Sequence, residues 1–308
     1  MAASSLDAIL ACPADQTPLQ PDGAGWCCPR GHTFHRGCHG YPEVACEGSF
    51  VLGVDTTSAH CATVQESGGL RVYDAYLKRW LTQKGAHTVL DAGCGVGVGV
   101  AAMRHDGFDA LGIDVRSVAG LWAELEHDQD GFVVGDVTAL PFRADVFDAV
   151  MCLGVVEHVG TRTGHLTLSD HWRQQRRTFA GELSRVVRPG GSILLACPNK
   201  RFPFDIQHGP NDALTYAPRR TKIFDRTGVN VHPTWGAYHL ASYADVRSWF
   251  GRDRVRPLPL TDYFGFSALQ RGGLLGHLAN AAQLYVDHLP KPLRGTALNP
   301  YLLVEIQV

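Results

Sequence analysis

Thr88-Val-Leu-Asp-Ala-Gly-Cys-Gly-Val-Gly97 is the stretch that decides the fold, because an apolar strand runs directly into a glycine-rich turn. Gly93, Gly95 and Gly97 let the backbone approach a ligand with no Cβ in the way. A helix that begins near Gly97 presents free N–H groups and the positive end of its dipole. The stretch therefore predicts a ligand-binding turn between a buried strand and a helix.

Apolar and amphipathic segments alternate outward from this turn. We expect strands at 88–92, 109–114, 131–135, 147–152 and 191–197, and helices at 70–81, 97–105, 117–127, 171–188 and 242–250. The chain should end with an extended segment near 253–264, a helical stretch at about 267–288 and a strand at 299–307. Arg188-Pro-Gly-Gly191 should close the helix before it, since proline cannot continue a helix. The pattern predicts a doubly wound α/β fold, with a mostly parallel sheet covered on both faces.

Length and composition limit the class of protein. The chain has 308 residues, 45% of them hydrophobic, and a formal net charge of −2. That suits one large domain with a small appendage and excludes a disordered protein. We find no apolar run near the roughly 20 residues that span a bilayer, and the N-terminus does not look like a signal peptide. We therefore expect a cytoplasmic protein with no membrane partner.

The first 50 residues form a separate compositional region, which we interpret as a zinc-ribbon-like module ahead of a main domain at 51–308. Cysteines interleaved with histidines in a reducing compartment favour metal binding over disulfides. Two short-spaced pairs, Cys12/Asp15 and Cys28/His32, would supply the four donors that tetrahedral Zn²⁺ prefers. Alternative ligands stand nearby in the sequence: Cys27, His35 and Cys38.

An acidic residue indicates what the glycine turn binds. Asp114 ends the next strand, 23 positions after Asp91, where a carboxylate can accept hydrogen bonds from both ribose hydroxyls. Val98 stands where a dinucleotide fingerprint would place its third glycine, so NAD is the second choice. The two features together predict a nucleoside ligand.

Further motifs follow in order: Gly135-Asp-Val-Thr-Ala-Leu-Pro-Phe142, Phe147-Asp-Ala-Val150 and Val187-Arg-Pro-Gly-Gly191. With the glycine turn and Asp114, this series resembles the class I S-adenosylmethionine-dependent methyltransferases over about residues 85–200. The resemblance implies S-adenosylmethionine as cofactor. It places Asp91 and Gly93 beside its methionine end, Gly95 and Gly97 along the turn, and Asp114 on the ribose.

The same resemblance assigns the adenine and the acceptor side. Asp136 would take the adenine amino group, the Val137 backbone N–H would meet a ring nitrogen, and Glu157 would contact the cofactor. His158 follows Glu157 just beyond the fourth strand, at the edge where open α/β sheets bind ligands. If the acceptor is a hydroxyl, His158 is the first candidate base, because histidine titrates near neutrality.

Residues 198–241 interrupt the alternation with prolines, aromatics and histidines, and a loop of that length is typically functional. We interpret this insert as a lid over the acceptor, with His208 and His232 as further catalytic candidates. A metal site formed by His208, His232 and His239 is another interpretation, although no helix fixes their spacing.

Three functions compete. The first is methylation of a small-molecule acceptor, at a hydroxyl of a specialised metabolite. The second is methylation of a ribosomal RNA base, because the N-terminal segment resembles the zinc ribbon of certain rRNA guanine methyltransferases and the insert is rich in basic residues. The slightly acidic chain makes RNA the less favoured partner. The third is a non-catalytic, cofactor-binding partner subunit, and the sequence makes no prediction of oligomeric state.

Overall fold

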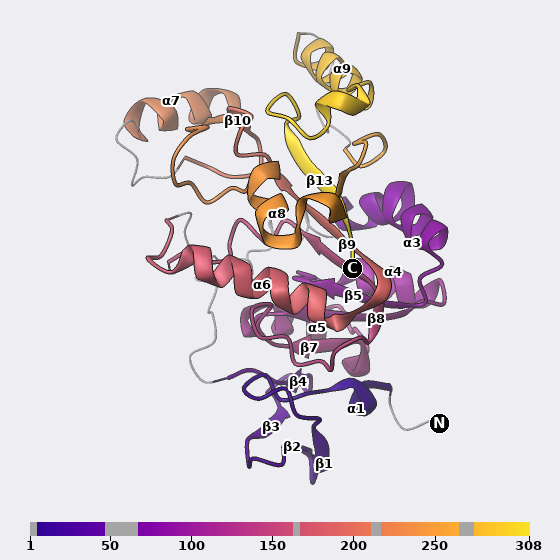
Figure 1. The fold of residues 1–308 in the computed structure, drawn as a ribbon. Coiled ribbons are helices and arrows are strands. Elements are labelled where there is room, and N and C mark those ends of the chain that lie inside the picture. The colour runs from indigo at the N-terminus through magenta and orange to yellow at the C-terminus, as the bar shows by residue number, and fades with distance from the viewer. Residues whose placement is uncertain (1–4, 47–66, 163–166, 211–216, 265–273) are drawn as a thin grey trace.

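The parallel strands form the centre of one mixed sheet in the computed structural model, which describes residues 5–46, 67–162, 167–210, 217–264 and 274–308 (Figure 1). They are β5 (Thr88–Ala92), β6 (Asp109–Asp114), β7 (Phe132–Val134), β8 (Phe147–Leu153) and β9 (Val187–Pro198). Their order is β7-β6-β5-β8-β9, and neighbouring pairs are parallel. The chain thus moves outward in one direction from β5 and then in the other from β8. Such a reversal leaves a crevice at the carboxyl ends of β5 and β8.

Helices cover both faces of this sheet. One face carries α6 (Trp172–Val186) and α8 (Tyr243–Phe250), whose Phe179, Leu183 and Val246 are fully buried. The other face carries a separate core cluster, contributed by η1 (Tyr73–Leu77), α3 (Lys78–Lys84), α4 (Val98–His105), η2 (Arg116–Val118) and α5 (Ala119–Glu124). The doubly wound α/β fold predicted from the sequence is therefore confirmed.

The ends of α3 and α6 show where local sequence does and does not set a helix boundary. Gly85 ends α3 in the left-handed conformation, with φ of +62°, which glycine adopts without strain. The helix expected at 171–188 ends earlier, at Val186. Arg188 to Gly191 belong instead to β9, which shifts register where it passes Phe147 and Ala149 of β8.

The N-terminal residues extend the same sheet. After α1 (Ser5–Ile9), the strands β1 (Gln20–Asp22), β2 (Gly25–Cys27), β3 (Thr33–Arg36) and β4 (Pro42–Glu43) pair in an antiparallel series. β4 then pairs with β7, and the Val44 N–H donates to the Val134 carbonyl at 2.9 Å. Because α1 and the β-ribbon bury Leu10, Trp26 and Phe34 in the main hydrophobic cluster, this segment is packed against the sheet.

The C-terminal strand completes the other edge. β13 (Tyr301–Gln307) lies antiparallel to β9, and β12 (Val255–Pro257) lies antiparallel to β13 at the sheet edge. The segment expected to be extended at 253–264 contains only β12 after the short η4 (Arg252–Arg254). α9 (Leu274–Asp287) and η6 (Lys291–Leu293) lead into β13, and residues 267–273 of the expected helical stretch lie outside the described residues.

The insert at 198–241 contains regular structure that the sequence did not predict. β10 (Phe204–Asp205) pairs with β11 (Asn230–Val231), and α7 (Ala217–Thr227) lies between them in sequence. Figure 1 shows α7 and β10 away from the β-ribbon, at the opposite end of the molecule. Residues 211–216 of the insert and 47–66, which include the expected module boundary near 50, lie outside the described residues. Among the described helices, none has the length and apolar character to cross a membrane.

Candidate cofactor and acceptor site

The glycine turn after β5 has a backbone conformation that favours glycine. Gly93, Gly95 and Gly97 have φ of +88°, +54° and +81°. A Cβ on Gly93 would lie 2.2 Å from Val155 Cγ2, and one on Gly97 would lie 2.5 Å from Phe132 Cε1. The turn is therefore both left-handed and closely packed, and it leads directly into α4.

Asp114 fixes this turn to the end of β6. Its Oδ2 accepts the Gly95 N–H at 2.7 Å, and its Oδ1 accepts the Val115 N–H at 2.7 Å. The indole of Trp122 donates to the Gly95 carbonyl at 2.7 Å, so the turn is held from both sides. Burial raises the pKa of Asp114.

Asp91 lies near the end of β5, two residues before Gly93 of the same turn. Burial, with a further contribution from the charge of Asp114, raises the pKa of Asp91 to about 7. A Cβ placed on Gly99 would lie 3.7 Å from Asp91 Oδ2, so this carboxylate faces the first turn of α4. Two neighbouring, half-buried carboxylates favour a cationic or hydroxyl-bearing ligand at this site.

A cavity of about 290 Å³ opens where these strands end. Its walls include residues after β5, β6, β7 and β8 and one from α6: Gly93, Asp114, Asp136, Val137, His158 and Gln175. Asp136 is fixed by its own turn, because its Oδ1 accepts both the N–H and the hydroxyl of Thr138 at 2.7 Å. The structure thus brings the sequence-predicted residues of four separate motifs to one cavity.

Histidines from the insert continue from this cavity as a row of rings. His158 lines the cavity and lies 5.5 Å from His208, measured between ring centroids. His208 lies 5.1 Å from His239, which is 4.4 Å from Tyr238. His232 stacks on Tyr238 at 4.9 Å, so it lies at the far end of the row. Of the three candidate catalytic histidines, His158 and His208 are in contact, and His232 reaches them through two intervening rings.

The rings of His158 and His208 differ in electrostatic environment. His208 Nδ1 lies 2.8 Å from Asp205 Oδ2, and Asp205 is 2% exposed. Burial alone would lower the pKa of His208, but the Asp205 carboxylate outweighs it and the pKa is raised. Burial lowers the pKa of His158 to about 3, with a further contribution from His208. His158 is therefore a neutral imidazole at physiological pH.

Glu157 is buried against the same rings. It is 1% exposed, and neither carboxylate oxygen has a hydrogen-bond partner among the described residues. Its Oε1 lies 3.9 Å from His208 Nε2. Burial raises the pKa of Glu157 to about 7.

Two residues of this region were missed as site residues by the sequence interpretation. Asp205 stands three positions before His208, and that spacing in an irregular segment is a signal that could have identified the pair. Arg176 of α6 is 1% exposed, donates from Nε to the Val159 carbonyl at 3.0 Å, and also donates to the His239 carbonyl. Through these two hydrogen bonds, Arg176 connects the insert to the loop after β8. No local sequence pattern indicates this role.

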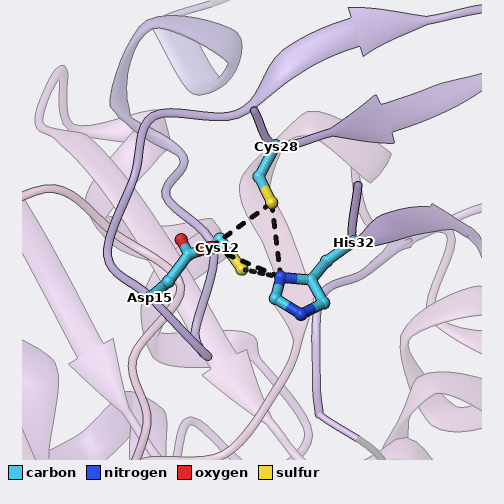
Figure 2. A group of neighbouring side chains, drawn as sticks. All are labelled: Cys12, Asp15, Cys28 and His32. Atoms are coloured by element: carbon cyan, nitrogen blue, oxygen red, sulfur yellow. Dashed lines mark hydrogen bonds and ion pairs between the residues drawn. The ribbon is translucent and has the colours of Figure 1, made fainter. Parts of the chain in front are cut away.

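The predicted N-terminal metal ligands also converge, although they come from segments up to 20 residues apart. His32 Nδ1 lies 3.4 Å from Cys12 Sγ, 3.3 Å from Cys28 Sγ and 3.4 Å from Asp15 Oδ2 (Figure 2). Asp15 Oδ1 is occupied by Thr17, whose N–H and hydroxyl donate to it. Zn²⁺ with bonds of about 2.0–2.3 Å needs donors about 3.3–3.8 Å apart at the corners of a tetrahedron. The three distances from His32 and the 3.5 Å between Cys28 Sγ and Asp15 Oδ2 fit that geometry.

Comparison with known proteins supports this description. Residues 90–195 match the family model described as "Methyltransferase domain". A Mycolicibacterium smegmatis protein named "Probable S-adenosylmethionine-dependent methyltransferase" is 25% identical over 192 residues, covering 61% of this chain and 69% of its own. Glycine N-methyltransferase of Mus musculus is 28% identical over 175 residues, covering 52% and 57%. Ubiquinone biosynthesis O-methyltransferase of Methylocella silvestris is 29% identical over 196 residues, covering 54% and 71%.

The reversed strand order, the glycine turn and the matched domain together define a class I methyltransferase fold. Within that class, residues 90–195 are a methyltransferase domain, and the chain is similar to S-adenosylmethionine-dependent methyltransferases. It spans little more than half the length of the mouse relative.

Proposed function

We propose that this enzyme transfers the methyl group of S-adenosylmethionine to a hydroxyl oxygen of a small molecule. This acceptor would lie between the cofactor cavity and the row of rings that runs from His158 through His208. The observation that carries the proposal is the position of His158. It lines the cavity at the strand ends and contacts His208 of the insert. The cofactor and an acceptor-activating group would therefore meet at one place.

The carboxylates are proposed to bind the cofactor. Asp114 would accept hydrogen bonds from the ribose hydroxyls, and Asp136 with the Val137 N–H would meet the adenine edge. All three residues line the cavity, which supports these roles. Asp91 and Gly93 would lie beside the methionine end, and Gly95 and Gly97 would keep the turn open. Each carboxylate is buried or fixed by backbone N–H groups, which orients it before the ligand arrives.

The proposed reaction is an in-line displacement. The acceptor oxygen attacks the methyl carbon, the carbon–sulfur bond breaks, its electron pair stays on sulfur, and the hydroxyl proton passes to the basic group that activates the oxygen. Alignment in an enclosed pocket provides much of the acceleration. We propose that His158 and His208 activate the oxygen. Glu157, which the sequence assigned to the cofactor, has its Oε1 3.9 Å from His208 Nε2, and we propose that it acts with them instead. Asp205 orients His208, and His232 with the rest of the insert at 198–241 shapes the acceptor side.

We further propose a structural Zn²⁺ bound by Cys12, Asp15, Cys28 and His32, within a module whose boundary lies near residue 50. The donor distances given above support it. Zinc there would stabilise the β-ribbon that extends the sheet beyond β7, because binding energy at such a site is folding energy.

The test combines binding with product analysis. Calorimetry with S-adenosylhomocysteine should give saturable one-to-one binding, and labelled S-adenosylmethionine should transfer its methyl group to a member of a hydroxylated small-molecule panel. Transfer to amines alone would overturn the oxygen assignment. Cofactor binding without transfer to any acceptor would support the non-catalytic partner subunit.

Ribosomal RNA is the second candidate acceptor, favoured by one observation. Arg219, Lys222 and Arg226 of α7 are exposed, and the exposed Asp225 adds a negative charge to the same helix. Including ribosomal RNA in the same panel decides between the two acceptors, because RNA transfer should fall steeply with added salt.

A further inference from the structure

Three of the acceptor-side residues form a cluster with the donor set of a metal site. Glu157, His158 and His208 each offer one ligand atom, and these atoms all lie within 4.8 Å of one another. Glu157 and His158 follow β8, whereas His208 comes from the insert just after β10. The cluster therefore joins the sheet edge to the insert.

Among the residues that the structure describes, none forms a hydrogen bond with the buried carboxylate of Glu157. Both of its oxygens are buried and unbonded among the described residues. The approach of His208 Nε2 to Oε1, at 3.9 Å, is too long for a hydrogen bond. A buried carboxylate without hydrogen bonds is unfavourable, and the charge pairing with His208 at 3.9 Å leaves both oxygens of Glu157 able to coordinate a metal ion.

The orientation of His208 supplies an independent argument. Its Nδ1 faces Asp205 Oδ2 at 2.8 Å, and Asp205 is itself held by the Gln207 N–H at 2.8 Å. A proton on Nδ1 donated to Asp205 leaves the lone pair of Nε2 directed toward Glu157. A histidine that donates its other nitrogen to a carboxylate is the usual arrangement around metal-bound imidazoles.

We infer that Glu157, His158 and His208 bind one divalent transition-metal cation at the acceptor side of the cavity. Two imidazoles with one carboxylate suit Zn²⁺, Fe²⁺ or Mn²⁺ rather than Ca²⁺ or Mg²⁺. Three protein ligands leave coordination positions open for another molecule. This cation is separate from the proposed N-terminal zinc, whose donors include two thiolates.

The inference rests on the proposed function and states how the oxygen is activated. A hydroxyl bound to the cation would lose its proton to solvent at neutral pH, because a metal ion lowers the pKa of a bound oxygen. The resulting alkoxide would attack the methyl carbon as the carbon–sulfur bond breaks and its electron pair stays on sulfur. The two histidines then act as ligands, and Asp205 acts as a positioning residue through His208.

The experiment uses Co²⁺ as the probe, because its absorption spectrum reports its ligands. In the full chain carrying both Cys12→Ser and Cys28→Ser, titration should give one bound Co²⁺ with visible d–d bands and no thiolate charge-transfer band. Glu157→Gln and His208→Gln, each placed in that background, should abolish this binding. His232→Gln is the matched control, a buried insert histidine outside the cluster, and should retain it.

Asp205→Asn gives a graded test of the same site. Loss of the carboxylate partner should weaken Co²⁺ binding by about 10–100-fold without abolishing it, the usual effect of removing such a partner. A purely structural role for Asp205 would leave the Co²⁺ affinity of the folded variant unchanged, and that result would contradict the inference.

Metal analysis of the chain with its cysteines intact keeps the inference testable if the double variant does not fold. The parent chain should bind two equivalents and Glu157→Gln one. Equal metal content in the two would overturn the inference, as would d–d bands that survive Glu157→Gln. S-adenosylhomocysteine titration runs in parallel. Cofactor binding with methyl transfer but no metal at the cluster defeats this inference alone, whereas absence of cofactor binding defeats the proposed function.

Discussion

The two halves of the site are built in different ways. On the cofactor side, Asp91, Asp114 and Asp136 each stand at the end of a successive parallel strand, and the last two are held by backbone N–H groups within two residues or across the turn. On the acceptor side, His158 and His208 lie 50 positions apart and meet only because the insert folds back over β8. A strand end positions a side chain by local geometry, whereas the histidine cluster depends on long-range packing.

This difference predicts separable effects. Changes on the cofactor side should appear in ligand affinity, and changes on the acceptor side should appear in turnover. Any variant that moves both quantities together would show that the two halves are coupled through the loop after β8.

The largest effect is expected for Asp114→Ala. It removes the proposed acceptor for the two ribose hydroxyls and the hydrogen bond that holds the Gly95 N–H. Hydrogen bonds to a charged group contribute about 1.5–3 kcal/mol each, so S-adenosylhomocysteine should bind at least about 100-fold more weakly. Calorimetry measures this, with Asp253→Ala, an exposed carboxylate in η4, as the control. Unchanged affinity would remove the ribose assignment.

His208→Gln should affect the other half of the site. His208 is not part of the cavity wall, so S-adenosylhomocysteine affinity should stay within about threefold. Turnover should fall about 100-fold or more, the usual contribution of a group that activates an oxygen. Steady-state kcat measured beside calorimetry separates the two quantities, and the exposed His171→Gln is the control. Full activity would move oxygen activation elsewhere in the insert.

A smaller effect is expected from pH through Asp91. Its raised pKa of about 7 means that it is mostly protonated at pH 6 and mostly ionised at pH 8. Because the ionised form attracts the α-amino cation of S-adenosylhomocysteine, affinity should rise with pH, by about tenfold from pH 6 to pH 8 for a single titrating group. Asp91→Asn should flatten this dependence. A pH-independent affinity in the parent chain would exclude Asp91 as the partner of the amino group.

The smallest effect on the site is expected from Cys28→Ser. It removes one donor of the N-terminal cluster, so metal content should fall and residues 5–46 should become sensitive to limited proteolysis, since metal binding at such sites stabilises the fold. The cluster lies beyond the cofactor cavity, so affinity for S-adenosylhomocysteine should change by less than about threefold, as for independent sites. Cys38→Ser, which lies outside the cluster and is exposed, should change neither. Identical protease sensitivity of the two variants would count against the metal site.

Comparison of the two halves also shows how much was predictable. The strands predicted at 88–92 and 109–114 match β5 and β6 to the residue. A short apolar run between two turns favours a strand, and the turns define where it begins and ends. The four proposed N-terminal donors, which the structure brings together, were predicted because each pair lies within a few residues. Local spacing alone carries this information.

Other features needed the folded chain. α7 was not expected, because the prolines of the insert masked its helical segment, and Arg176 has no sequence signal because its partners are carbonyls of distant loops. His232 and His208 looked equivalent in sequence, yet only His208 contacts His158.

By itself, the sequence determined the alternating strands and helices of a doubly wound fold, the glycine turn and the acidic residues at the strand ends, since each of these is marked by a pattern of residues close in the chain. The tertiary structure alone decided which histidines approach the cofactor cavity and that Asp205 and Glu157 flank His208. The physical reason is that an irregular insert has no repeating hydrogen-bond pattern to fix side-chain directions, so burial against β8, α6 and its own short β10–β11 pair selects them.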